Sequence, residues 1–273
     1  MIDLDTALPP RSALYMPASN ARAIEKARGL AADMIILDLE DAVKPGLKDE
    51  ARLAAVDAMA EGFGNRLTAI RINAVESSWH RADIMAVRQA RCDFIVLPKV
   101  EDAASAAHVA ELVGKPLLVM IETPLGVLRA AEIARTEDVA GLLVGANDLA
   151  NMLRLPPSSD RSALSYALQA ILLAARAAGI WALDSVFNDL NDPEGLAAEC
   201  RAGRALGYDG KTLIHPNQID ITNQAFLPNA AEIEEARALI AAASGGAERF
   251  RDRMVETMHV EMAERLLARA GIA

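Results

Sequence analysis

Short runs of hydrophobic residues alternate along the chain with longer, alanine-rich segments of helical composition. Most of the runs lack polar alternation, which is typical of strands buried on both faces of a parallel sheet. Eight runs predict strands: Ala13–Met16, Met34–Leu39, Leu67–Ile72, Phe94–Leu97, Leu117–Ile121, Gly141–Val144, Trp181–Asp184 and Lys211–Ile214. The clearest predicted helices between them are Ala21–Ala32, Lys48–Ala60, Asp102–Val113, Ser162–Ala178 and Pro193–Leu206.

This repeating strand–helix pattern favours an α/β fold of the (β/α)8 barrel type over an open doubly wound sheet. We expect the barrel to occupy residues 1–228 and a short helical extension to occupy residues 229–273. In the extension, Asn229–Ala243 and His259–Ala270 predict helices, and a glycine pair and the charged segment Arg249–Arg253 separate them. Such a segment is typical of a mobile lid and equally of a frayed C-terminus, and both interpretations stay open.

Composition narrows the class of partner. The chain has 28 basic and 38 acidic residues, a net charge of −10, which argues against a nucleic-acid groove or an anionic membrane surface. An anionic substrate is still compatible, because it needs only a local positive site. The longest apolar stretch, Ala167–Leu183, contains Gln169 and Arg176 and does not predict a membrane span. Without a secretory signal pattern we expect a cytoplasmic protein, with Cys92 and Cys200 as buried, unpaired thiols.

Charged residues follow at least six of the eight predicted strands, where barrels of this type build their active sites. Glu122 and Asp148 follow adjacent strands, so their carboxylates are expected to meet. Mg²⁺, or Mn²⁺ in its place, binds through one or two carboxylates together with waters and substrate oxygens. The alternative for each acid is a solvated loop residue or a helix N-cap. Zinc is not predicted, because the four histidines show no paired spacing.

Two basic residues also lie at strand ends. Arg71 is inside an apolar strand and needs an anionic partner, which is either a substrate carboxylate or a protein acid such as Glu40 or Asp41. Lys99 could form a Schiff base. However, the acids expected around it would stabilise its ammonium form, so we favour a charge-balancing role.

Seven motifs in chain order resemble the citrate lyase beta-subunit-like branch of the HpcH/HpaI aldolase family. They are Arg11–Pro17, Asp38–Val43, Arg71–Asn73, Leu97–Val100, Ile121–Gly126, Gly145–Leu149 and Lys211–Gln218. The resemblance implies a Mg²⁺-dependent TIM barrel and a homo-oligomer, a trimer or hexamer. It also implies a coenzyme A thioester as substrate: citramalyl-, malyl- or citryl-CoA, cleaved between two carbons to an acyl-CoA and a 2-keto acid.

The resemblance also assigns roles to residues of the barrel. Glu122 and Asp148 match the metal ligands, and Arg71 matches the residue that holds the keto acid. Glu40 and Asp41 match groups that orient metal-bound water. The matched contacts to substrate and coenzyme A are Tyr15, Lys26, Asn147 and His215; Arg22 is a further base for the phosphates, and His215 could equally be a packing residue of the barrel rim.

The chain departs from this family near its C-terminus. Relatives often supply the general acid/base from a lid with the pattern Met-Val-Asp-x-Pro, which reaches a neighbouring subunit. Here the segment reads Met254-Val-Glu-Thr-Met258, with Glu256 in place of the aspartate. Glu256 is therefore a candidate acid/base in an altered loop.

Three alternatives to a carbon–carbon lyase that acts on a free coenzyme A thioester stay open. An acyl-CoA thioesterase would use the same scaffold to hydrolyse the thioester. A citrate lyase beta subunit would act on a citryl acyl-carrier-protein thioester, with that carrier as its partner. A non-catalytic protein that binds a metal and an acyl-CoA is the third. The acyl group itself has no sequence motif.

Overall fold

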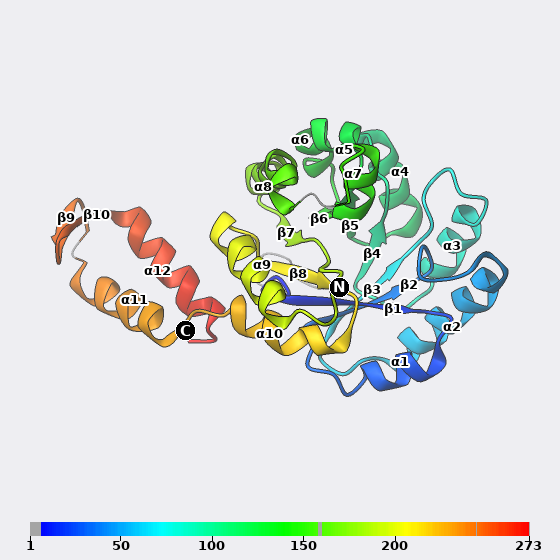
Figure 1. Ribbon diagram of the computed structural model, residues 1–273, viewed down its shortest axis with the longest axis horizontal. Coiled ribbons are helices and arrows are strands. Elements are labelled where there is room, and N and C mark those ends of the chain that lie inside the picture. Colours follow the sequence, from blue (N-terminus) through cyan, green and yellow to red (C-terminus); the bar gives the residue numbers. More distant parts are fainter. Residues whose placement is uncertain (1–6, 158–159, 244, 273) are drawn as a thin grey trace. The chain divides into compact units, whose positions relative to one another are not determined.

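The computed structural model describes residues 7–157, 160–243 and 245–272. Eight parallel strands close into a barrel in chain order, with β8 paired to β1 (Figure 1). The (β/α)8 prediction is therefore confirmed. The strands are β1 (Ser12–Pro17), β2 (Met34–Asp38), β3 (Leu67–Arg71), β4 (Phe94–Leu97), β5 (Leu117–Ile121), β6 (Val139–Val144), β7 (Trp181–Asp184) and β8 (Gly210–Leu213).

Helices surround the barrel, and they include several short ones that the sequence pattern did not predict. The α-helices up to the last strand and just beyond are α1 (Ala21–Ala27), α2 (Lys48–Glu61), α3 (His80–Val87), α4 (Ala103–Val113), α5 (Pro124–Leu128), α6 (Ala130–Ala134), α7 (Ala146–Met152), α8 (Ser165–Ala178), α9 (Pro193–Leu206) and α10 (Ile219–Ala225). Three single turns of 3-10 helix complete this part: η1 (Pro45–Leu47), η2 (Arg161–Leu164) and η3 (Pro216–Gln218). Within the described ranges, none of the helices is long and apolar enough to cross a membrane.

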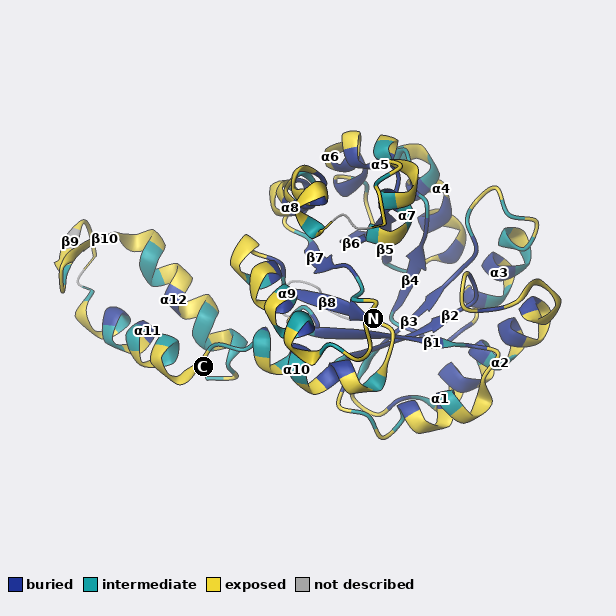
Figure 2. Ribbon diagram, in the orientation of Figure 1, coloured by how far each residue is buried: buried dark blue, intermediate teal, exposed yellow. Residues whose placement is uncertain are grey.

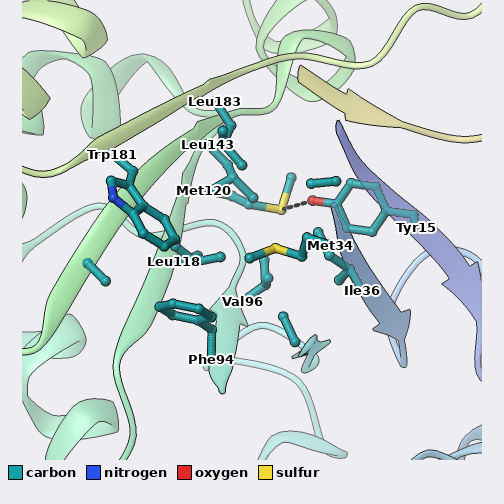
Figure 3. Close-up of a cluster of buried hydrophobic side chains, with 13 residues drawn as sticks. Tyr15, Met34, Ile36, Phe94, Val96, Leu118, Met120, Leu143, Trp181 and Leu183 are labelled. Carbon is teal, nitrogen blue, oxygen red and sulfur yellow. Dashed lines mark hydrogen bonds between the residues drawn. The ribbon is translucent and has the colours of Figure 1, made fainter. Parts of the chain in front are cut away.

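Alternate residues of the strands fill the barrel interior, where Phe94 and Trp181 pack with ring centroids 5.3 Å apart (Figure 3). Burial is nearly complete along the strands (Figure 2). Ile36, Ala69 and Met120 belong to this interior cluster. Because side chains alternate in direction along a strand, the residues two positions further on also point into the barrel, at its carboxyl end. Those residues are Asp38, Arg71 and Glu122. Cys92 and Cys200 are buried and free, as expected.

The chain divides into two compact units, Met1–Asn223 and Gln224–Ala273. In the second unit, α11 (Ala230–Ala242) and α12 (Thr257–Arg269) flank an antiparallel hairpin of β9 (Glu248–Phe250) and β10 (Arg253–Val255). Both helices were predicted within a few residues, whereas the hairpin forms where only a charged connecting segment was expected. A small apolar cluster holds this unit together; its buried members are Ala236, Leu239, Val255 and Ala263.

Candidate active site

A cavity of about 320 Å³ opens among the loops that follow the strands. The predicted residues Arg71, Glu122 and Asp148 all line it, so the structure brings together the side chains that were predicted from three separate strand ends. Its remaining lining residues are Tyr15, Asp38, Asp41, Ala42, Met120, Val144, Gly145, Ala146, Asn147, Val186, Thr212 and Ile214. The lining therefore combines acidic groups with apolar side chains, which is the usual character of a small-molecule site.

Arg71 and Asp38 form the main ion pair of the cavity. The two residues are register partners on the neighbouring strands β2 and β3. Arg71 Nε donates to Asp38 Oδ1 at 2.7 Å and Nη2 donates to Oδ2 at 2.6 Å. Burial alone would lower the Arg71 pKa, but the Asp38 carboxylate outweighs it and raises that pKa well above its usual value. Arg71 therefore stays charged.

Glu40 and Asp41 were the protein partners predicted for Arg71, whereas its closest partner, Asp38, was not predicted. Arg71 Nη1 lies 3.1 Å from Glu40 Oε2 and 4.0 Å from Asp41 Oδ2, so these acids contribute less than the two-pronged contact with Asp38. Strand alternation was the signal that could have found it, since Asp38 follows the inward-facing Met34 and Ile36 at the same two-residue spacing.

Glu122 is held in place from two sides. Its Oε1 accepts a hydrogen bond of 2.8 Å from the backbone N–H of Lys99. Its Oε2 lies against Gly145, where any Cβ would collide with it. Burial, assisted by the negative charge of Glu40, raises the Glu122 pKa to about 7. The carboxylate is thus fixed but poorly compensated by positive charge.

Lys99 links the acids of the site. Its backbone has φ +55°, a left-handed conformation that costs a non-glycine residue roughly 1–2 kcal/mol. Its Nζ donates to Glu40 Oε1 at 2.6 Å and lies 3.6 Å from Asp148 Oδ2. Burial lowers the Lys99 pKa, but the hydrogen bond to Glu40 and the negative charges of Glu40, Asp41 and Glu122 together outweigh it and raise that pKa. A Schiff base requires a neutral amine, so this environment opposes that role.

A buried lysine that was not predicted as part of the site, Lys48, supports the turn after β2. Lys48 Nζ donates to the backbone carbonyls of Leu39 and Glu40 and to Asn73 Oδ1, each at 2.7 Å. Asn73 in turn donates from Nδ2 to Asp83 Oδ2 at 2.6 Å. Lys48 is in the first turn of α2, and no local spacing shows that it reaches the ends of β2 and β3.

The acidic residues of the site fit a divalent cation. The carboxylates of Asp38, Glu40, Asp41, Glu122 and Asp148 outnumber the cations of Arg71 and Lys99. Burial also raises the pKa of Glu40. Among the described residues, no three His, Cys, Asp or Glu side chains are grouped closely enough to enclose a metal by themselves. A hard cation that keeps several waters, such as Mg²⁺, needs only one or two carboxylates.

Two of the predicted substrate contacts lie in the cavity wall. The Tyr15 hydroxyl donates to Met120 Sδ at 3.5 Å. The Arg71 guanidinium lies over the Tyr15 ring, 4.7 Å from the ring centroid. Burial raises the Tyr15 pKa, so it is a neutral phenol. Asn147 exchanges side-chain hydrogen bonds with Asn188, at 3.2 and 2.7 Å.

The other predicted contacts lie elsewhere. Lys26 is exposed on α1, and His215 precedes η3, where its Nδ1 accepts from the backbone N–H of Asn217 at 3.2 Å. Neither is among the residues that line the cavity in the described part of the chain. Glu256 precedes α12 in the second unit, and its backbone N–H donates to His259 Nδ1 at 3.0 Å. Its part in catalysis stays a prediction.

Comparison with known proteins places this site in a family. The family model of HpcH/HpaI aldolase/citrate lyase matches residues 11–216. The chain is 46% identical over 271 residues to a (3S)-malyl-CoA thioesterase of Cereibacter sphaeroides, covering 96% of this chain and 95% of the relative. It is 33% identical over 283 residues to the citrate lyase subunit beta of Escherichia coli, covering 96% and 94%.

A solved structure agrees with these relatives. The protein CitE of Mycobacterium tuberculosis, in complex with magnesium, acetoacetate and coenzyme A, superposes with a TM-score of 0.85 at 35% identity. The match covers 97% of this chain and 99% of that one. The chain therefore belongs to the HpcH/HpaI aldolase/citrate lyase family, a family of enzymes that includes lyases.

Proposed function

We propose that this protein hydrolyses the coenzyme A thioester of a small hydroxy-dicarboxylic acid such as (3S)-malyl-CoA. The observation that carries the proposal is the 46% identity to a (3S)-malyl-CoA thioesterase over nearly the whole of both chains. The identity to the citrate lyase beta subunit is 33% over a similar span. The carbon–carbon lyase expected from the motifs therefore becomes the second candidate.

In this proposal Glu122 and Asp148 hold Mg²⁺, or Mn²⁺ in its place. The support is the fixed Glu122 carboxylate, the surplus of acids around it, and a related structure in complex with magnesium. A bound divalent cation supplies Lewis-acid stabilisation of the substrate oxygens that develop negative charge. Substrate binding and proton transfer are assigned to side chains of the barrel.

Arg71 binds the free carboxylate of the acyl group. Asp38 occupies its Nε and Nη2, and its Nη1 lies 3.1 Å from Glu40 Oε2 and 3.8 Å from Met120 Sδ. Glu40 and Asp41 are the groups available to orient water and take its proton. The water oxygen bonds to the thioester carbonyl carbon, the carbon–sulfur bond breaks, and the proton goes to the departing thiolate of coenzyme A.

The residues proposed to contact the substrate and coenzyme A are assigned by where they lie relative to the cavity. Tyr15 is buried beside Arg71 and Met120, so we assign it to the acyl end rather than to the nucleotide. Asn147 lines the cavity and could contact the thioester or its hydroxyl. The exposed bases Lys26 and Arg22 on α1 are proposed for the phosphates, with His215 at the rim.

The second candidate is the lyase reaction on malyl-, citramalyl- or citryl-CoA. It is favoured by the citrate lyase relatives and by a related structure complexed with oxaloacetate and magnesium. Carbon–carbon cleavage leaves an enolate that must be protonated. Glu256 is the proposed acid, and the family pattern is altered at this position. A citrate lyase beta subunit that uses a citryl acyl-carrier protein is a variant of this candidate.

The proposed assembly and location rest on the family resemblance of the motifs and on the sequence pattern. We infer a homo-oligomer, a trimer or hexamer, in which residues 229–273 act as a lid on the barrel of residues 1–228, and a cytoplasmic location. Light scattering coupled to size exclusion tests the oligomer directly. A monomer at micromolar concentration would contradict it.

A substrate panel tests the function. Purified protein with Mg²⁺ is expected to release free thiol from (3S)-malyl-CoA without an equivalent amount of keto acid. EDTA should abolish the release. Keto acid released in step with acyl-CoA would favour the lyase, and no release from malyl-, citramalyl- or citryl-CoA would overturn both candidates.

A further inference from the structure

Lys99 contacts four of the acids at the carboxyl end of the barrel. Its backbone and its side chain make different contacts. The backbone N–H donates to Glu122 Oε1 at 2.8 Å. The ammonium lies 2.6 Å from Glu40 Oε1, 3.6 Å from Asp148 Oδ2 and 4.0 Å from Asp41 Oδ1. The residue therefore touches both proposed metal ligands, one with each half.

The two halves have opposite effects on a divalent cation. The backbone contact fixes Glu122 in one orientation, and the left-handed φ of +55° is what aims the N–H at it. That fixed orientation favours metal binding, because the Glu122 side chain loses little conformational entropy when a metal binds. The ammonium, by contrast, lies beside Asp148 with a positive charge of its own, and it repels a cation that uses the same carboxylate.

The ammonium is also partly open to solvent. The Lys99 side chain is 37% exposed and carries its charge on a flexible four-carbon stem. Its contact with Asp148 is longer than its hydrogen bond with Glu40. Loss of the Asp148 contact alone therefore leaves the stronger contact intact.

We propose that the Lys99 ammonium is an exchangeable counter-ion of the metal site, which neutralises Asp148 and Glu40 in the metal-free protein and gives up Asp148 when a divalent cation binds. Lys99 is thus a positioning residue that keeps metal binding weak and reversible. The inference rests on the metal site of the proposed function. It goes further by assigning a residue that opposes the metal.

The test measures metal affinity and metal-free stability in the same variants. Lys99→Met removes the charge and keeps the backbone N–H. We expect EDTA-treated Lys99→Met protein to unfold at a lower temperature than wild type, because Glu40 loses its nearest cation. We also expect it to bind Mg²⁺ at least about tenfold more tightly by titration calorimetry, because one repulsive charge is gone. If Lys99 had only a structural role, its substitution would lower both the unfolding temperature and the Mg²⁺ affinity.

Control variants separate the effect of the Lys99 charge from the effects of side-chain size and of position in the barrel. Lys99→Arg keeps the charge and should bind Mg²⁺ like wild type. Lys115→Met makes the same change next to the start of β5, at the opposite end of the barrel, and should leave the affinity unchanged. If Lys99→Met does not fold, Lys99→Gln, which can still donate to Glu40, should show the same tightening.

The outcomes distinguish the inference from the proposed site. Wild type that binds Mg²⁺, with Lys99→Met or Lys99→Gln binding it equally or more weakly, overturns the role of Lys99 alone. Wild type and variants that all fail to bind Mg²⁺ or Mn²⁺ overturn the metal site and this inference with it.

Discussion

Arg71 and Asp38 are register partners on adjacent strands, and their side chains form a two-pronged ion pair at the carboxyl end of the barrel, with contacts of 2.7 and 2.6 Å. Both residues are buried. A buried charge is costly unless it is paired and hydrogen-bonded, and each of these two residues supplies the closest opposite charge to the other. The pair therefore also fixes the plane of the guanidinium whose remaining nitrogen lies near the cavity.

Removal of Asp38 should take away both hydrogen bonds of the two-pronged contact and leave Glu40 Oε2, 3.1 Å from Nη1, as the nearest carboxylate to the buried Arg71 charge. We expect Asp38→Ala to lower the free energy of unfolding by roughly 3–5 kcal/mol, measured by urea denaturation. Asp41→Asn is the matched control, because the Asp41 side chain is 63% exposed and 4.0 Å from Arg71, and it should cost less than about 1 kcal/mol. Equal effects of the two substitutions would contradict the assignment.

Gly145 leaves room for Glu122. A Cβ at position 145 would collide with the Glu122 side chain, whereas a Cβ at Gly46 meets nothing within 4 Å. Gly145→Ala is expected to cost about 1–3 kcal/mol of stability and to weaken Mg²⁺ binding, since Glu122 must move. Gly46→Ala should leave both unchanged. Normal Mg²⁺ affinity in Gly145→Ala would show that the position of Glu122 is not critical.

The barrel and much of its site could be predicted because parallel strands buried on both faces produce uninterrupted apolar runs. The residues that follow those runs, such as Arg71, Glu122 and Asp148, then share one end of the barrel. The features of the site that could not be predicted depend on contacts between segments that are distant in the sequence. Lys48 reaches the ends of β2 and β3 from the start of α2, and this contact has no local signature.

Short elements escaped for a different reason. Helices of five to eight residues, such as α5 and α3, span too few turns to show a hydrophobic period, and the β9–β10 hairpin has only three residues in each strand. The position of Asp38 inside the barrel could have been predicted from the sequence. It follows Met34 and Ile36 with inward alternation, and its partnership with Arg71 required only the strand register.

The raised pKa of Glu122 predicts a pH dependence of stability in the metal-free protein. The pKa is about 7 when folded, against 4.5 as the usual value, so the folded protein binds this proton more tightly than the unfolded chain does. Its stabilising contribution is complete below pH 4.5 and is lost as the pH rises to about 7. The loss should approach about 3 kcal/mol.

This pH effect can be isolated by subtraction. Urea denaturation in EDTA at pH 5 and pH 7.5 should show a larger loss of stability in wild type than in Glu122→Gln, which cannot titrate. Identical losses in the two proteins would mean that Glu122 titrates normally.

The proposed metal ligands should be needed for turnover. We expect Glu122→Gln and Asp148→Asn each to lower kcat/KM by at least about 100-fold, because Lewis-acid stabilisation is worth several kcal/mol. Glu111→Gln, on the exposed side of α4, should behave like wild type. Activity in Glu122→Gln that persists in EDTA would argue for a metal-independent reaction.

Glu256 separates the two candidate reactions. Hydrolysis requires no enolate, so Glu256→Gln should retain thiol release from (3S)-malyl-CoA close to the wild-type rate. Loss of a required general acid/base typically costs about 10²–10⁴-fold. A loss of that size, seen in keto-acid release, would instead assign Glu256 to carbon–carbon cleavage.

The most direct test of the central claim is the identity of the products formed from (3S)-malyl-CoA. Proton NMR of a complete reaction with Mg²⁺ should show malate and free coenzyme A in equal amounts, with wild-type protein and not with Glu122→Gln. Glyoxylate and acetyl-CoA in equal amounts, without malate, would contradict hydrolysis and identify the protein as a carbon–carbon lyase.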